Sequence, residues 1–94
     1  NDEILISIAN GVIGDSFSEL NQNEDALDYY IKASKLNNNN FTTPIYLMKA
    51  GKTAQLLSDY NKALSLYSKI KKDYPNSKEA QSIDKYITMI KSKI

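Results

Sequence analysis

The side chains that could do chemistry in this 94-residue chain are carboxylates, lysines and tyrosines, because the sequence contains neither histidine nor cysteine. Histidine is the most common general base and zinc ligand, and cysteine supplies nucleophiles and thiolate ligands. The densest acidic group, Glu24, Asp25 and Asp28, falls in the first turns of a predicted helix, where the helix dipole favours negative charge. Helix capping explains these acids without a metal. We therefore expect no enzymatic activity, no cofactor and no metal site.

A second group of candidate residues is the basic cluster of Lys69, Lys71, Lys72 and Lys78. Nucleic acid is the partner that such a cluster most readily suggests. All twelve basic residues of the chain are lysine, so no arginine can make bidentate contacts to phosphates or bases. No aromatic stacking platform lies beside the cluster in the sequence either. We expect no nucleic-acid partner.

Charge is unevenly distributed along the chain, although the net charge is only +1. Residues 1–31 contain seven acidic residues and no lysine, whereas residues 32–94 contain twelve lysines and four acidic residues. No apolar run approaches the ~20 residues that a membrane-spanning helix needs, and the run at residues 4–9 is only six long. The sequence predicts an electrically asymmetric domain that does not itself insert into a membrane.

The elements that must position these side chains come from an internal repeat. When the sequence is shifted by 37 residues against itself, residues 8–35 align with residues 45–72, and eight positions are identical. They include a glycine, at Gly14 and Gly51, and a tyrosine, at Tyr30 and Tyr67. Such self-similarity predicts two copies of one structural unit.

Apolar residues within each unit recur at helical spacing with a turn between two runs, which predicts two antiparallel helices per unit. The expected core positions are Ile13, Phe17, Leu20, Ala26, Leu27, Tyr30 and Ala33 in the first unit, and Leu47, Ala50, Ala54, Leu57, Ala63, Leu64, Tyr67 and Ile70 in the second. Gly14 and Gly51 fall inside the first helix of each unit, where glycine costs up to ~1 kcal/mol relative to alanine. We expect two helices to approach closely at both glycines.

Two helix starts carry signals of their own. Thr43 followed by Pro44 has the pattern of an N-cap and a proline in the first helical position. Asn76 and Glu79 have the spacing of a capping box, which opens a last helix after Pro75. The apolar stripe of that helix is Ala80, Ile83, Ile87, Ile90 and Ile94. A helix with one such stripe is suited to close the end of a stack.

In this register the two units resemble tetratricopeptide repeats, which are 34-residue helix pairs with small and aromatic residues at characteristic places. The signature positions hold Gly14, Phe17, Ala26, Tyr30 and Ala33 in the first unit, and Gly51, Ala54, Tyr60, Ala63, Tyr67 and Pro75 in the second. The resemblance implies an all-α fold, a right-handed helix-turn-helix stack that forms an alpha-alpha superhelix. We expect one domain over residues 1–94, with repeat 1 at about 7–40, repeat 2 at about 44–77 and a capping helix at about 77–93.

Three phrases of the sequence, at residues 41–44, 73–77 and 83–87, also resemble bacterial cell-envelope tetratricopeptide proteins. In that group one N-terminal membrane helix precedes the repeats. The resemblance implies that the chain is attached to the bacterial cell envelope through an upstream membrane helix. Because the sequence begins at Asn1 without a methionine, we expect it to be a fragment of a longer protein.

Members of the repeat family bind partner proteins in a groove lined by the first helix of each pair. The resemblance therefore implies a groove at Ile8, Val12, Asp15, Glu19, Ile45, Met48, Lys49, Lys52 and Gln55. A mixed apolar and charged face of this kind suits a peptide or a helix of a partner protein. The alternative interpretation is a solvated face in which Asp15 and Lys52 neutralise each other.

Structural self-association is the alternative function. The chain opens with Ile4, Leu5 and Ile8, which fall at the unpaired end of the predicted stack. The end of a repeat stack is apolar unless a capping element covers it. A second copy of the module, or a further repeat, would cover this surface.

Overall fold

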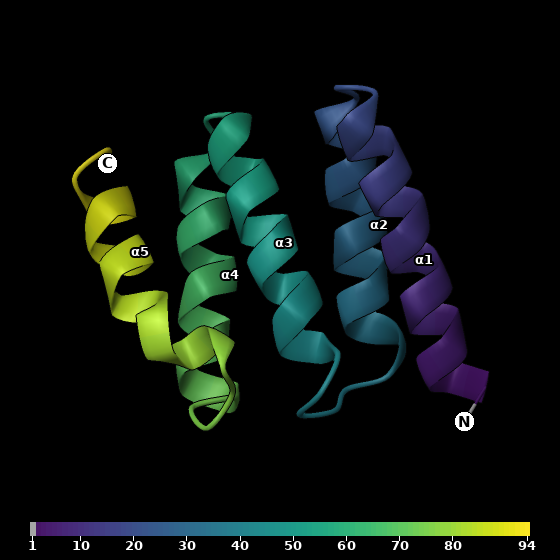
Figure 1. Ribbon diagram of the computed structural model, residues 1–94. Coiled ribbons are helices and arrows are strands. Elements are labelled where there is room, and N and C mark those ends of the chain that lie inside the picture. Colours follow the sequence, from purple (N-terminus) through teal and green to yellow (C-terminus); the bar gives the residue numbers. More distant parts are fainter. Residues whose placement is uncertain (1) are drawn as a thin grey trace.

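The computed structural model describes residues 2–94, so residue 1 of the predicted domain lies outside the described residues. Every regular element in this range is helical, and each α-helix packs beside the next, from α1 at one end of the stack to α5 at the other (Figure 1). The elements are α1 (Asp2–Glu19), α2 (Asn23–Leu36), α3 (Thr43–Leu56), α4 (Tyr60–Asp73), the short 3-10 helix η1 (Glu79–Ser82) and α5 (Ile83–Lys91). The predicted all-α stack of helix pairs is confirmed.

The two helix pairs turn in the same way. Asn21 and Ser58 occupy equivalent positions of the repeat, and both take a left-handed backbone conformation, with φ of 58° and 60°. In both units the amide of the following residue donates to the carbonyl five residues before it, over 2.9 Å. These bonds satisfy carbonyls that a helix end otherwise leaves open. The duplicated sequence thus keeps one turn geometry in both pairs.

The core is centred on the second helix of each pair and on α3. The buried residues include Ala26, Leu27, Tyr30 and Ala33 of α2, Leu47, Ala50 and Ala54 of α3, and Ala63, Tyr67 and Ile70 of α4. All of these were expected from the helical spacing of apolar residues. The core prediction is therefore confirmed for these three helices.

Helix α1 departs from the predicted pattern. Its buried residues are small, namely Ser7, Gly11 and Gly14. The sequence places Ile13 and Leu20 in the core, but Ile13 and, in the turn after α1, Leu20 are exposed. Tyrosine rings from α2 and α3 already fill the interface, so only small residues of α1 can approach it. Periodicity showed that α1 has an apolar face but not which of its faces packs, and the prediction for these two residues is wrong.

In each helix pair, a glycine of the first helix packs against a tyrosine ring of the second. A Cβ atom added to Gly14 would lie 2.8 Å from the ring of Tyr30 on α2, and one added to Gly51 would lie 2.4 Å from the ring of Tyr67 on α4. Real Cβ atoms essentially never come so near a ring atom. The close approach predicted at both glycines is confirmed, and its partner in each repeat is the tyrosine that the repeat also preserves.

A third glycine contact joins the two pairs to each other. A Cβ atom added to Gly11 would lie 2.2 Å from the ring of Tyr46 on α3. Gly11 is buried, and Tyr46 belongs to the core. The second repeat therefore packs against the first through Tyr46, which has no equivalent tyrosine in the first repeat.

The start of α3 differs in detail from the prediction. Thr43 is the first residue of α3 and not its cap, and no side chain caps this helix. Its fully buried hydroxyl instead accepts a hydrogen bond from the Asn39 amide and donates one to the Asn37 carbonyl, each over 3.0 Å. Pro44 lies in the first turn, as expected. Thr43 thus fixes the loop between the repeats.

The last helix also begins differently. The hydroxyl of Ser77, and not the side chain of Asn76, accepts a hydrogen bond from the Ala80 amide over 3.1 Å. The predicted capping box is therefore wrong, and a 3-10 turn precedes α5. The predicted stripe packs through Ile83 and Ile90, which are buried in the core, whereas Ile94 lies beyond the helix and is exposed.

Replacing Gly51 with leucine should lower the free energy of unfolding by about 1–3 kcal/mol. The ring of Tyr67 that faces Gly51 is fully buried, so it cannot move away from a larger side chain. Chemical denaturation measures the change. Leucine at Ser68, an exposed position on α4, is the control and should change stability by less than about 0.5 kcal/mol. A Gly51→Leu protein as stable as the wild type would show that the contact is not tight.

Candidate partner-binding groove

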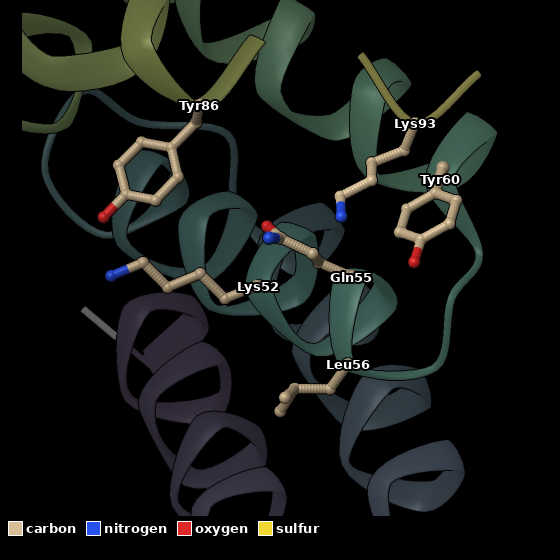
Figure 2. A pocket seen from close by; sticks show the side chains of 6 residues that line it. All are labelled: Lys52, Gln55, Leu56, Tyr60, Tyr86 and Lys93. Carbon is tan, nitrogen blue, oxygen red and sulfur yellow. The ribbon is translucent and has the colours of Figure 1, made fainter. Parts of the chain in front are cut away.

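An open pocket of about 510 Å³ lies between the end of α3 and the C-terminal part of the chain. Its walls are Lys52, Gln55 and Leu56 from α3, Tyr60 from α4, Tyr86 from α5 and Lys93 beyond α5. Figure 2 shows Lys52 and Tyr86 at one side of the pocket, Lys93 and Tyr60 at the other, and Gln55 between them. The packing of α3, α4 and α5 therefore positions the pocket.

Gln55 is the polar group at the middle of the pocket, and the core orients it. The hydroxyl of Tyr67 donates a hydrogen bond to its side-chain oxygen over 3.0 Å, and its amide nitrogen approaches the sulfur of Met89 at 3.8 Å. Burial raises the pKa of Tyr67 to about 12, so the hydroxyl remains protonated and able to donate at neutral pH. One N–H of the Gln55 amide thus points to Met89, and the other N–H is the group left for a ligand.

Two lysine ammonium groups lie near the ring of Tyr86 at one side of the pocket. The ammonium groups of Lys52 and Lys85 lie 5.3 Å and 5.2 Å from the ring centroid, within the range of cation–π attraction. The same ring lies 5.4 Å from the ring of Tyr67, centroid to centroid. The buried ring of Tyr67 thus packs against the partly buried ring of Tyr86, and two lysine ammonium groups lie near the ring of Tyr86.

Comparison with known proteins found a family match over α3 and α4, the two helices that supply most residues of the pocket. Residues 46–77 match the family model described as Tetratricopeptide repeat. The match falls within the second predicted unit and covers most of α3 and all of α4. No curated protein and no solved structure matches the chain. The expected attachment to the bacterial cell envelope stays a prediction, and no helix within residues 2–94 is long and apolar enough to cross a membrane.

Asp15, one of the residues expected in the groove, joins the helix pair α3–α4 to the helix pair before it. Its carboxylate binds the ammonium of Lys49 on α3 at 2.9 Å and 3.1 Å and accepts a hydrogen bond from the hydroxyl of Tyr30 on α2. The expected neutralisation of Asp15 by Lys52 is therefore wrong, because Lys52 lies over Tyr86. Lys49, one turn earlier on α3, takes that role.

The electrostatics of this junction follow from its contacts. Burial alone would raise the pKa of Asp15, but the hydrogen bonds from Tyr30 and Lys49 and the charge of Lys49 outweigh it, and the pKa lies below its ordinary value. The pKa of Tyr30 is raised well above its ordinary value, first by burial and then by its bond to Asp15. At neutral pH the carboxylate is charged and the phenol neutral, which is the pairing that the geometry requires.

The remaining residues of the predicted groove are spread over a wider surface. Ile8, Val12 and Glu19 are exposed on α1, and Ile45 is half-buried against the core. Met48 is only 8 % exposed and belongs to the core, so it offers little surface to a ligand. Of the nine residues predicted, Lys52 and Gln55 are the two that line the pocket.

Four residues of the pocket are not among these nine, namely Leu56 of α3 and, outside the first helix of either repeat, Tyr60, Tyr86 and Lys93. The sequence predicted a groove on the first helix of each complete repeat and a last helix that serves only as a cap. Yet α5 packs against α4 as α3 packs against α2 (Figure 1), and Tyr86 of α5 lines the same pocket. The continuing stack was the signal that could have found them.

Replacing Asp15 with asparagine should lower the free energy of unfolding at pH 7 by roughly 1 kcal/mol, a modest loss because both Asp15 and Lys49 are partly exposed. Because folding lowers the pKa of Asp15, its contribution is present above the ordinary value of 3.8 and is lost as pH falls through the lower folded value. Denaturation at a series of pH values measures both effects.

The control for this prediction is Glu19→Gln, which removes an exposed carboxylate one turn further along α1. It should leave both the stability at pH 7 and its acid dependence close to those of the wild type. The idea fails if Asp15→Asn loses stability on acidification below pH 4 as steeply as the wild type does.

Proposed function

We propose that this chain is a protein-interaction module that binds a peptide or a helix of a partner protein in the groove between α3 and α5. Tetratricopeptide repeats mediate protein–protein interaction, and residues 46–77 match that family. The observation that supports the groove as the binding site is the open pocket of about 510 Å³ beside α3. Lys52 and Gln55, which the sequence singled out, are among its walls.

The make-up of the pocket supports a peptide as its ligand. Leu56 is 70 % exposed and offers an apolar contact, while Gln55 offers a hydrogen-bond donor held by the core. Tyr60 and Tyr86 add amphipathic rings on opposite sides (Figure 2). Aromatic surfaces near a directed polar group are typical of sites that hold a chain segment, since they bury area without losing much conformational entropy.

Selection from a random 12-residue peptide library displayed on phage tests the proposal. We expect the purified domain to select binding peptides, and replacement of Leu56 with serine to weaken them about tenfold or more, because it removes the main exposed apolar contact of the pocket. Fluorescence anisotropy with synthetic peptides measures the dissociation constants.

The matched control is Leu36→Ser, which removes an exposed leucine at the end of α2 and away from the pocket. It should leave peptide binding unchanged. Failure to select any peptide, or binding that is indifferent to Leu56, would refute the groove as the binding site.

A second candidate function, self-association through α1, is favoured by the outward face of this helix. Leu5 is 63 % exposed and Val12 is 56 % exposed, and Ile6, Ile8 and Ile13 are exposed beside them. From Ile4 to Gly14 the helix carries no charged residue. Contiguous exposed apolar surface of this kind marks interaction sites in folded proteins.

A second copy of the chain is the occupant that we propose for this face. An uncharged apolar face is complementary to itself, as a two-fold symmetric interface requires. A head-to-tail arrangement would instead bring the acidic N-terminal half of one copy to the lysine-rich C-terminal half of another. The two arrangements respond oppositely to salt, because screening weakens attraction between unlike ends and relieves repulsion between like ends.

Leu5→Asp should turn a self-associating domain into a monomer, because it places a charge within the exposed apolar surface. Light scattering coupled to size-exclusion chromatography measures the mass across a range of concentrations and salt. Leu36→Asp on α2 is the control and should leave the mass unchanged. A wild-type mass that is monomeric at every concentration, at both low and physiological salt, would rule out self-association.

A further inference from the structure

We infer that the groove between α3 and α5 selects an acidic segment, with carboxylate side chains of the partner placed against Lys52 and Lys93 and an apolar side chain between them. This inference rests on the proposed function and adds the chemistry of the partner. Its basis is the charge of the pocket: two of the six lining residues are lysines and none is acidic.

Three lysines of the stack are neutralised by carboxylates, and the lysines at the pocket are not among them. Lys49, Lys69 and Lys71 form ion pairs with Asp15, Asp73 and Asp84. Within residues 2–94, Lys52, Lys85 and Lys93 have no carboxylate within ion-pair distance. The positive charge around the pocket is thus left uncompensated, while that of three other lysines is neutralised.

The acidic residue nearest in sequence to Tyr86 is already engaged. Asp84 binds the ammonium of Lys71 on α4 at 2.7 Å, so it serves the contact between α4 and α5. Lys52 and Lys85 meanwhile both approach the ring of Tyr86, which brings two like charges to one aromatic group. A partner carboxylate there would supply the missing counter-charge and relieve the repulsion between the two ammonium groups.

The long-range field acts in the same direction. The pocket lies wholly in the part of the chain that carries twelve lysines and four acidic residues. A surface of one sign raises the association rate of an oppositely charged partner. Leu56, exposed at the edge of the pocket, favours an amphipathic protein segment over a simple anion or a nucleic acid (Figure 2).

The experiment uses the peptides that the wild-type domain selects from the random library. We expect them to contain more Glu and Asp than the unselected library does. In the tightest binder, replacing every acidic residue with glutamine should weaken binding about tenfold, and replacing each with lysine should weaken it further. Anisotropy at about 50 mM and about 500 mM salt should show weaker binding of the acidic peptide at the higher concentration.

Charge reversal of the pocket sharpens the test. The double variant Lys52→Glu/Lys93→Glu should select peptides enriched in lysine and arginine and lose affinity for the acidic peptide by more than about tenfold. Lys32→Glu/Lys72→Glu makes the same change in net charge at two exposed positions outside the pocket, and it should retain the acidic preference. Circular dichroism of both variants verifies that they are folded.

Each outcome decides the inference. Selected peptides without an acidic excess, or glutamine versions that bind as tightly as the acidic originals, would overturn it while leaving the groove as a peptide site if Leu56→Ser still weakens binding. An oligo-dT strand that displaces the acidic peptide at equal concentration would also overturn it, in favour of nucleic acid. Selection of no peptide at all would remove the proposed function and the inference together.

Discussion

The contact between a mid-helix glycine and a buried tyrosine is the constraint on which the stack depends. Gly51 lets the ring of Tyr67 lie against the backbone of α3, and Gly14 does the same for Tyr30 and α1. The hydroxyl of each ring donates a hydrogen bond to a polar side chain on the first helix of its pair, Gln55 in the second pair and Asp15 in the first. A packing contact thus also sets the position of a polar side chain on the first helix of each pair.

The junction between the pairs repeats this logic with different partners. Tyr46 packs over Gly11, and the Asp15–Lys49 ion pair lies on the same two helices. Ring packing supplies the close fit, since small residues along α1 admit bulky ones from α3. The ion pair adds little to the free energy of folding, because both of its side chains are partly exposed. Its main effect is to orient α3 relative to α1. These contacts, together with the core that α2 and α3 share, fix the order of the helices.

The fold was largely predictable from the sequence, whereas the site was only partly so. The 37-residue repeat and the glycines identified the helix pairs and their closest contacts, because those features are local and occur twice. The inward face of α1 was not predictable, since Ile13 and Gly14 are neighbours and only the tyrosines of other helices decide which one packs. Tyr86 and Lys93 join Lys52 only through the placement of α5, a tertiary contact that helical spacing does not encode.

Tyr67 is a buried core residue that contacts two side chains of the groove. Its ring contacts the ring of Tyr86, and its hydroxyl donates a hydrogen bond to Gln55. A ligand that contacts those two side chains is therefore coupled to the core of the second helix pair. Occupancy and folding are then thermodynamically linked, because a ligand that binds only the folded groove must stabilise it. The last helix, which forms one wall, would open less often with the groove filled, and its backbone amides would exchange with solvent more slowly.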